Sequence, residues 1–134
     1  MKEIITSEKG PKPAGPYSPA VKLNELVFLS GQIGADPQTG ELISGPIQAQ
    51  TARVLDNLQL VLEGAGLSLQ DVIRTTVYLK DMNDFAAMNE AYGRYFSTNP
   101  PARTTIEVAR LPRDARIEID AIAADMHGKY PFTK

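Results

Sequence analysis

Apolar side chains recur at helical spacing in two segments of the chain, which predicts two amphipathic helices. The first is expected over residues 46–64, where Pro46 suits the first turn and glycines follow the last apolar position. Its apolar stripe consists of Ile47, Thr51, Val54, Leu58, Val61 and Leu62. The second helix is expected over residues 84–97, where the sequence STNPP ends the pattern. Its stripe consists of Phe85, Met88, Tyr92, Tyr95 and Phe96.

Other segments are rich in β-branched residues and alternate between apolar and polar positions, as strands do. Strands are expected over residues 20–23, 26–33, 72–80, 103–111 and 115–126, the first two joined as a hairpin at Asn24-Glu25. Alternation in the third of these places Ile73, Thr75, Val77 and Leu79 on one face of the strand. In the last strand, it places Ile117, Ile119, Ala121 and Ala123 on the face that meets the helices.

The resulting order, β-β-α-β-α-β-β, favours an α+β fold in which both helices pack on one face of a single mixed sheet. The length of 134 residues fits one domain over residues 1–134. The other sheet face is polar at one end and apolar at the other, and no helix remains to cover it. We therefore expect a homo-oligomer.

Composition narrows the class of protein. Hydrophobic residues make up 43% of the chain and charged residues 22%, as in ordinary globular proteins, and the net charge of −2 argues against a general nucleic-acid binder. Cysteine is absent, which excludes disulfides, thiolate metal ligands and a cysteine nucleophile. The first residues lack the apolar core of a signal peptide, and no apolar run approaches the ~18 residues that cross a bilayer. We expect a cytoplasmic protein without a membrane anchor.

Several familiar catalytic signatures are missing. The single histidine, His127, has no cluster of carboxylates around it in the sequence, so we expect a surface residue rather than a metal ligand. The chain has no GxSxG, GxGxxG or Walker motif. Nothing in the sequence points to a metal, a nucleotide or a prosthetic group.

Two charged residues stand out among the polar positions that remain. Arg103 follows the rigid pair Pro100-Pro101 and opens a strand. Its guanidinium can bind a substrate carboxylate through two hydrogen bonds, or it can pair with an Asp or Glu of the chain. Glu118 lies within the last strand, on the face turned away from the helices. It is either a solvated position, a partner for Arg103 or Arg116, or a functional acid.

Four further residues lie at element ends or beside an apolar stripe. Tyr17 interrupts a Pro/Gly-rich loop and is either a hydrophobic plug or part of a site. Ser30 precedes Gly31, where the absence of a side chain lets a ligand approach the backbone closely. Asn89 borders the stripe of the second helix and suits either a helix-to-loop hydrogen bond or a ligand contact.

The chain resembles the Rid family, also called YjgF-like proteins, and most closely its reactive-intermediate deaminase (RidA) branch. The matching motifs are GPYSPA (15–20), LSGQI (29–33), TTVYLKDMNDF (75–85) and PARTTIEVARLPRDARIEIDAIA (101–123). The resemblance covers nearly the whole chain. It implies a chorismate-mutase-like fold, a homotrimer with active sites between subunits, and no cofactor.

The activity implied by the resemblance is hydrolysis of 2-imino acids, such as 2-iminopropanoate and 2-iminobutanoate, to 2-oxo acids and ammonia. By position, Arg103 matches the arginine that clamps the substrate carboxylate, and Glu118 matches the acid that positions water. Tyr17, Ser30, Gly31 and Asn89 match residues that line the same pocket. Thr105 stands where many relatives carry cysteine, at a position whose backbone N–H helps to hold the carboxylate.

Two other functions remain open at this level. The same pocket would serve a non-catalytic protein that binds 2-oxo acids or similar metabolites. Older family labels, translation inhibitor and endoribonuclease, fit the acidic charge balance less well. The pKa of Glu118 is also open, because burial would raise it and a neighbouring arginine would lower it.

Overall fold

The computed structural model describes residues 1–126, so that His127 lies outside the described part of the chain. Six strands and two α-helices form the fold, with three short 3₁₀ helices between them. The strands are β1 (Glu3–Ile5), β2 (Ala20–Leu23), β3 (Leu26–Ile33), β4 (Val72–Leu79), β5 (Ala102–Glu107) and β6 (Ile117–Ala124). The α-helices are α1 (Ile47–Gly64) and α2 (Phe85–Tyr95).

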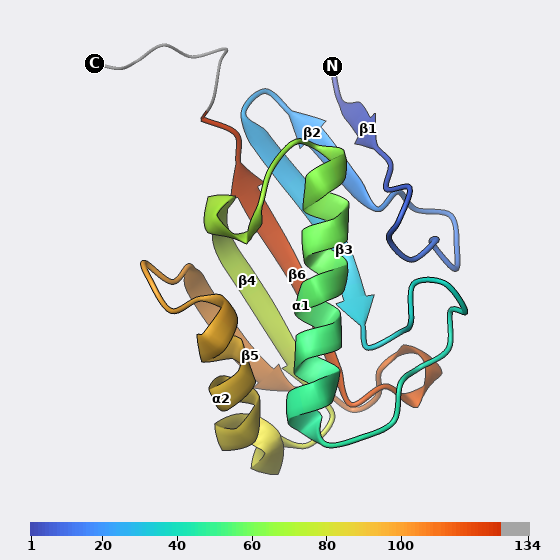
Figure 1. Ribbon diagram of the computed structural model, residues 1–134, viewed down its shortest axis with the longest axis vertical. Helices are drawn as coiled ribbons and strands as arrows, with labels where there is room; N and C mark the ends of the chain where they lie inside the picture. The colour runs from blue at the N-terminus through green and yellow to red at the C-terminus, as the bar shows by residue number, and fades with distance from the viewer. Residues whose placement is uncertain (127–134) are drawn as a thin grey trace.

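Both helices lie on one face of a single mixed sheet, as the sequence pattern predicts (Figure 1). The strand order is β1-β2-β3-β6-β4-β5, and every neighbouring pair is antiparallel except β4 with β5. The parallel pair requires a crossover connection, and α2 supplies it. The last strand, β6, thereby comes to lie in the middle of the sheet.

One strand was not expected from the sequence. β1 has only three residues, forms the edge of the sheet and pairs with β2 alone among the strands that the structure describes. The backbone just after β1 runs against the end of α1, where a Cβ on Gly64 would lie 2.2 Å from the carbonyl oxygen of Thr6. Such a strand depends on long-range contacts, and a local pattern of three residues does not reveal it.

The predicted grouping of Ile73 with Thr75, Val77 and Leu79 on one face of β4 was wrong at Ile73. Thr75, Val77 and Leu79 are buried, but Ile73 is 49% exposed and Val72 is buried instead. The register between β4 and β6 shifts between Val72 and Arg74, which marks a β-bulge or irregularity. An extra residue there reverses which side chain points inward.

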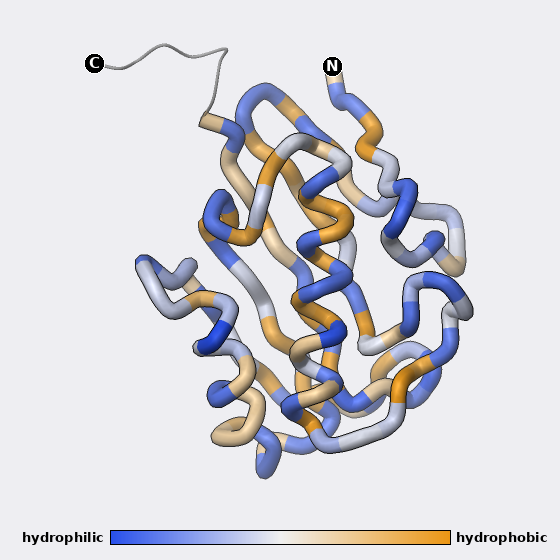
Figure 2. The backbone as a smooth tube through the Cα atoms, in the orientation of Figure 1, coloured by the Kyte–Doolittle hydropathy of each residue, from blue (hydrophilic) through white to orange (hydrophobic). Residues whose placement is uncertain are grey.

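The core lies between the sheet and the helices. Every residue of the predicted α1 stripe is buried, and so are the four inward residues predicted for β6. Figure 2 shows apolar stretches alternating with polar ones along α1 and the central strands. On the opposite sheet face, Phe28 and Ile106 remain 41% and 40% exposed. Within residues 1–126, neither helix is long and apolar enough to cross a membrane.

A buried amide ties α1 to the chain that leaves β3. Asn57 is fully buried, and its Nδ2 donates to the carbonyl oxygens of Ala35 and Ile33 at 2.8 and 3.2 Å. Its Oδ1 accepts from Nε of Arg53 at 3.1 Å. The Ile33 carbonyl also accepts from the backbone N–H of Ala35, whereas Asn57 is the donor that the structure shows for the Ala35 carbonyl within residues 1–126.

We predict that Asn57→Leu lowers the free energy of unfolding by about 1–3 kcal/mol, since it leaves the buried carbonyl of Ala35 without its donor and removes one of the two donors to the carbonyl of Ile33. Urea unfolding at fixed protein concentration measures the change. Gln48→Leu is the control, because Gln48 lies in the same helix and makes no side-chain hydrogen bond within the described residues. Equal unfolding midpoints for the two variants would contradict this role of Asn57.

Candidate functional site

Arg103 lies on β5 and faces the helices. Its partner in the parallel ladder is Thr75, which is buried on the helix side of the sheet. The guanidinium carbon lies 4.7 Å from the ring centre of Tyr92 and 5.7 Å from that of Phe85. Arg103 forms no ion pair with any residue in the range 1–126. One of the two alternatives was that Arg103 pairs with an Asp or Glu of the chain. Within residues 1–126 the structure shows two aromatic rings beside the guanidinium instead of a carboxylate.

Two other predicted site residues lie on this side of the sheet. Phe85, Asn89 and Tyr92 follow each other at spacings of four and three along α2, so they share one helix face. Thr105 lies two residues after Arg103 and therefore points to the same sheet face. We use the name arginine half-site for five residues: Phe85, Asn89, Tyr92, Arg103 and Thr105.

The arginine half-site contains two buried oxygens with unused hydrogen-bonding capacity. Asn89 Oδ1 and Thr105 Oγ1 are buried and have no hydrogen-bond partner within the described residues. Buried polar atoms in proteins are nearly always paired. These two oxygens, together with the Arg103 guanidinium, are suited to polar groups of a ligand or of a second chain.

Glu118 lies on the opposite face of the sheet. Its flanking residues Ile117 and Ile119 are fully buried against the helices, so Glu118 points to the face that the helices leave open. Gly31 lies directly against it: a Cβ at Gly31 would fall 2.1 Å from Oε2 of Glu118. A larger residue at this position would force the Glu118 carboxylate to move, so glycine lets the carboxylate keep this place.

An irregularity in β3 shapes the backbone around Glu118. The register with β6 shifts between Leu29 and Gln32, which places Ser30 and Gly31 in the shifted segment. The Ser30 hydroxyl donates to the carbonyl oxygen of Ser18 at 2.7 Å and so ties β3 to the N-terminal loop. Bulges and irregularities of this kind are common beside active sites.

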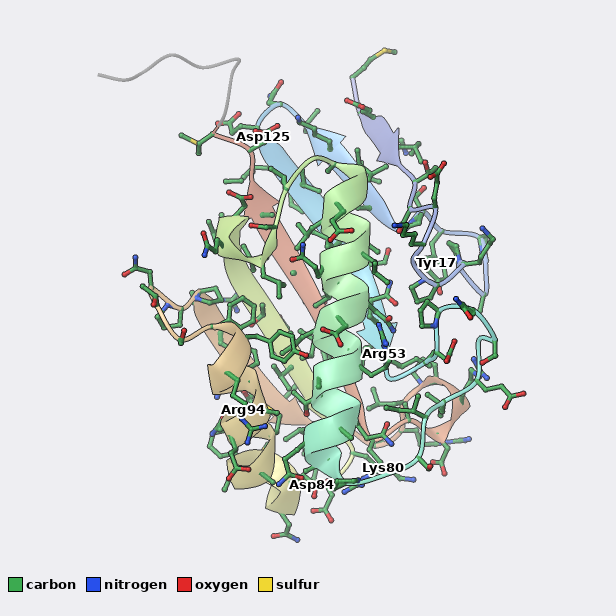
Figure 3. All side chains as sticks on the ribbon, in the orientation of Figure 1. Tyr17, Arg53, Lys80, Asp84, Arg94 and Asp125 are labelled. Carbon is green, nitrogen blue, oxygen red and sulfur yellow. The ribbon has the colours of Figure 1, made fainter. Side chains whose placement is uncertain are left out.

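Tyr17 lies on that N-terminal loop (Figure 3). The residue is 52% exposed, so it is not the buried plug that one alternative proposed. Its hydroxyl accepts a hydrogen bond from the backbone N–H of Ala14 at 3.2 Å. We call Tyr17, Ser30, Gly31 and Glu118 the glutamate half-site.

A cavity of about 350 Å³ adjoins the glutamate half-site. Tyr17, Gly31 and Glu118 line it together with three loops, which contribute mainly residues 11–14, 37–40 and 112–113. Its size suits a small metabolite. Ser30 is not among the residues that line this cavity, and neither is any member of the arginine half-site.

The two half-sites do not meet within one chain. Arg103 and Glu118 lie on opposite faces of the sheet, with β4 between their strands. The sequence groups all seven predicted residues into one pocket, whereas the structure divides them into a set of three and a set of four.

Burial controls the ionisation of Glu118 in this chain. Its pKa is raised from the ordinary value of 4.5, first by loss of solvent and then by the negative charge of Asp120. Arg103 does not offset this shift, since it lies on the other sheet face. A carboxyl group with a raised pKa is better matched to accepting a proton near neutral pH.

Sequence reasoning did not connect three residues with the arginine half-site. The helical pattern places Tyr92 and Phe85 only in an apolar stripe. Strand alternation places Thr75 only on one face of its strand. The hydroxyl groups of Thr75 and Tyr92 are hydrogen-bonded at 2.7 Å. The spacing of Phe85, Asn89 and Tyr92 on one helix face is the signal that would have grouped the aromatic rings with Asn89.

Comparison with known proteins identifies the family. The family model described as Endoribonuclease L-PSP matches residues 7–125. A RutC family protein of Pyrococcus horikoshii is 58% identical over 123 residues, covering 92% of this chain and 98% of its own. The chloroplastic Reactive Intermediate Deaminase A of Arabidopsis thaliana is 46% identical, covering 91% of this chain and 65% of its own.

Solved structures agree with the sequence relatives. The crystal structure of Escherichia coli TdcF with bound serine superposes with a TM-score of 0.87 at 42% identity, covering 91% of this chain and 98% of its own. The chain belongs to the Endoribonuclease L-PSP family, which is the Rid or YjgF-like family. The expected YjgF-type, chorismate-mutase-like fold is thereby confirmed.

We predict that Asp120→Asn lowers the pKa of Glu118, since it removes a negative charge that disfavours ionisation. The pKa should still exceed 4.5, because burial, the larger cause, remains. Titration of the Glu118 carboxyl carbon by ¹³C NMR measures both values.

Asp114→Asn serves as the control for this titration, because the Asp114 carboxylate is paired with Lys80 and does not act on Glu118. A wild-type Glu118 that titrates at or below its ordinary value would contradict the prediction.

Proposed function

We propose that this protein is a 2-imino acid deaminase, which hydrolyses 2-iminobutanoate, 2-iminopropanoate and similar reactive imines to 2-oxo acids and ammonia. The observation that carries the proposal is the combination of an arginine that pairs with no carboxylate among residues 1–126 and a half-buried carboxyl group with a raised pKa. Kinship to a protein named Reactive Intermediate Deaminase A supports it. We propose that the reaction needs no cofactor, since the imine carbon is already electrophilic.

In this mechanism, Arg103 binds the substrate carboxylate through two N–H donors and so fixes the position of the imine carbon. Asn89 and Thr105 complete the polar wall beside it. The unpaired Oδ1 and Oγ1 of these residues support such a role, because each oxygen can accept a hydrogen bond from the substrate or from a bound water.

Glu118 acts on the attacking water. It removes a proton as the water oxygen bonds to the carbon of the protonated imine, which gives a neutral carbinolamine. It then gives this proton to the nitrogen, the carbon–nitrogen bond breaks, and the carboxylate takes the remaining hydroxyl proton as the carbonyl forms and ammonia leaves. That last proton passes to the ammonia or to solvent, which returns Glu118 to its starting state. The raised pKa of Glu118 favours both transfers, because the group can hold the proton between the two steps.

We further propose that the two half-sites meet between subunits of a homotrimer. The arginine half-site of one subunit would face the glutamate half-site of the next. The separation of Arg103 from Glu118 within one chain supports an intersubunit site. The exposed Phe28 and Ile106 on the open sheet face support an assembly that covers them.

Two alternative functions are tested by the same variants. Binding of a small carboxylate without turnover is consistent with TdcF, whose structure contains serine. In that case Glu118→Gln would retain binding of 2-oxobutanoate and wild type would show no hydrolysis.

The second alternative is the endoribonuclease activity in the family description, and the net charge of −2 argues against it. Failure to retain RNA at low ionic strength would exclude it.

We predict that Arg103→Ala and Glu118→Gln each lower kcat/KM for 2-iminobutanoate by about a hundredfold or more. Arg103→Lys should recover only part of the loss, because one ammonium cannot make the paired hydrogen bonds. Release of 2-oxobutanoate, with the imine generated in situ by a threonine dehydratase, measures the rate.

Arg94→Ala is the control variant for these measurements, since Arg94 is exposed on α2 and its ion pair is with Glu90 of the same helix. A wild-type rate equal to the spontaneous rate would overturn the enzymatic proposal.

Complementation tests the intersubunit site directly. We predict that Arg103→Ala and Glu118→Gln chains, unfolded together and refolded as a mixture, regain about a quarter of wild-type activity. Random mixing gives one site in four an intact Arg103 from one subunit and an intact Glu118 from the next. A mixture no more active than its two components would contradict a site shared between subunits.

A further inference from the structure

We propose that Tyr92 is a positioning residue for Arg103: its ring supports the guanidinium, and its hydrogen bond to Thr75 adds to the packing that holds the ring in place. This inference deepens the proposed function, on which its kinetic part rests. It assigns a task to a core aromatic residue that the mechanism above does not use.

Three contacts connect these residues. The Arg103 guanidinium carbon lies 4.7 Å from the centre of the Tyr92 ring. The Tyr92 hydroxyl is 2.7 Å from Oγ1 of Thr75, and both residues are buried. Thr75 is also the ladder partner of Arg103 on the neighbouring strand. The ring is thus held at its hydroxyl end by the same pair of strands that carries the arginine.

An aromatic ring is a suitable support for a guanidinium that must bind substrate. The ring face attracts the cation, while the N–H donors lie in the guanidinium plane and stay available. A carboxylate partner would use those same donors. Burial raises the pKa of Tyr92, so the ring stays uncharged near neutral pH and does not form an ion pair with Arg103.

A second aromatic ring packs against Tyr92. Tyr92 contacts Phe96 with ring centres 4.7 Å apart and is only 5% exposed. Phe85 adds a second, more exposed ring 5.7 Å from the guanidinium. A purely structural Tyr92 would fill the core equally well without affecting Arg103, and the experiment must separate these two roles.

The Nε–Hε resonance of Arg103 in ¹⁵N-labelled protein reports its position, and Arg103→Lys assigns the signal. In wild type and in Tyr92→Phe, the aromatic ring should shift this resonance upfield of the other arginines. In Tyr92→Leu it should return to their average position. Tyr95→Leu is the matched control, because Tyr95 lies on the same helix but bonds to Asp56 on α1.

Kinetics provide the second readout. Tyr92→Leu should lower kcat/KM for 2-iminobutanoate about tenfold, mainly through KM, and Tyr92→Phe should restore most of it. In an Arg103→Ala background, Tyr92→Leu should have no further effect. A structural role would instead lower activity by the same factor in both backgrounds, and that result would overturn the proposal.

The wild-type spectrum tests the positioning role of Tyr92 even if Tyr92→Leu does not fold. An Arg103 resonance at the average arginine position in wild type would overturn the positioning role, whereas an upfield signal that Tyr92→Phe preserves supports it. Absence of imine hydrolysis by wild type would overturn the proposed function alone. The two failures are therefore distinguishable.

Discussion

A residue on a β-strand points to one face of its sheet or to the other, and this constraint separates Arg103 from Glu118. Ladder pairing places Arg103 beside buried Thr75, under the helices, and alternation along β6 turns Glu118 outward. No side-chain rotation brings the two together through the sheet. If both residues act on one substrate, the protein must use a second copy of itself, so the assembly becomes part of the chemistry.

Much of the fold could be predicted from the sequence because its signals are local. The α1 stripe and the inward residues of β6 are set by periodicity, and both predictions are confirmed. β1 and the register shift next to Ile73 depend on pairing between distant strands, and the sequence pattern missed both. The periodicity of apolar residues is clearest in α1 and β6, each of which buries one whole face in the core.

The candidate site follows the same rule. Alternation along the last strand places Glu118 on the face turned away from the helices, as the structure has it, but the pattern assigns no face to Arg103 and so does not reveal that the two residues lie on opposite faces. The contact between Gly31 and Glu118 connects two distant strands, and the contact between Arg103 and Tyr92 connects a strand with a helix. Neither contact produces a repeating pattern of residues in the sequence.

The environment of Glu118 also affects how stable the chain is at different pH values. Its pKa in the folded chain is raised above the ordinary value that an unfolded chain would show. The folded state therefore binds this proton more tightly, and its contribution to stability is lost as pH rises through the folded pKa. Ionised Glu118, the form that can accept a proton, is thus the less stable form of the fold. Any gain in reactivity at this position is balanced by a loss of conformational stability.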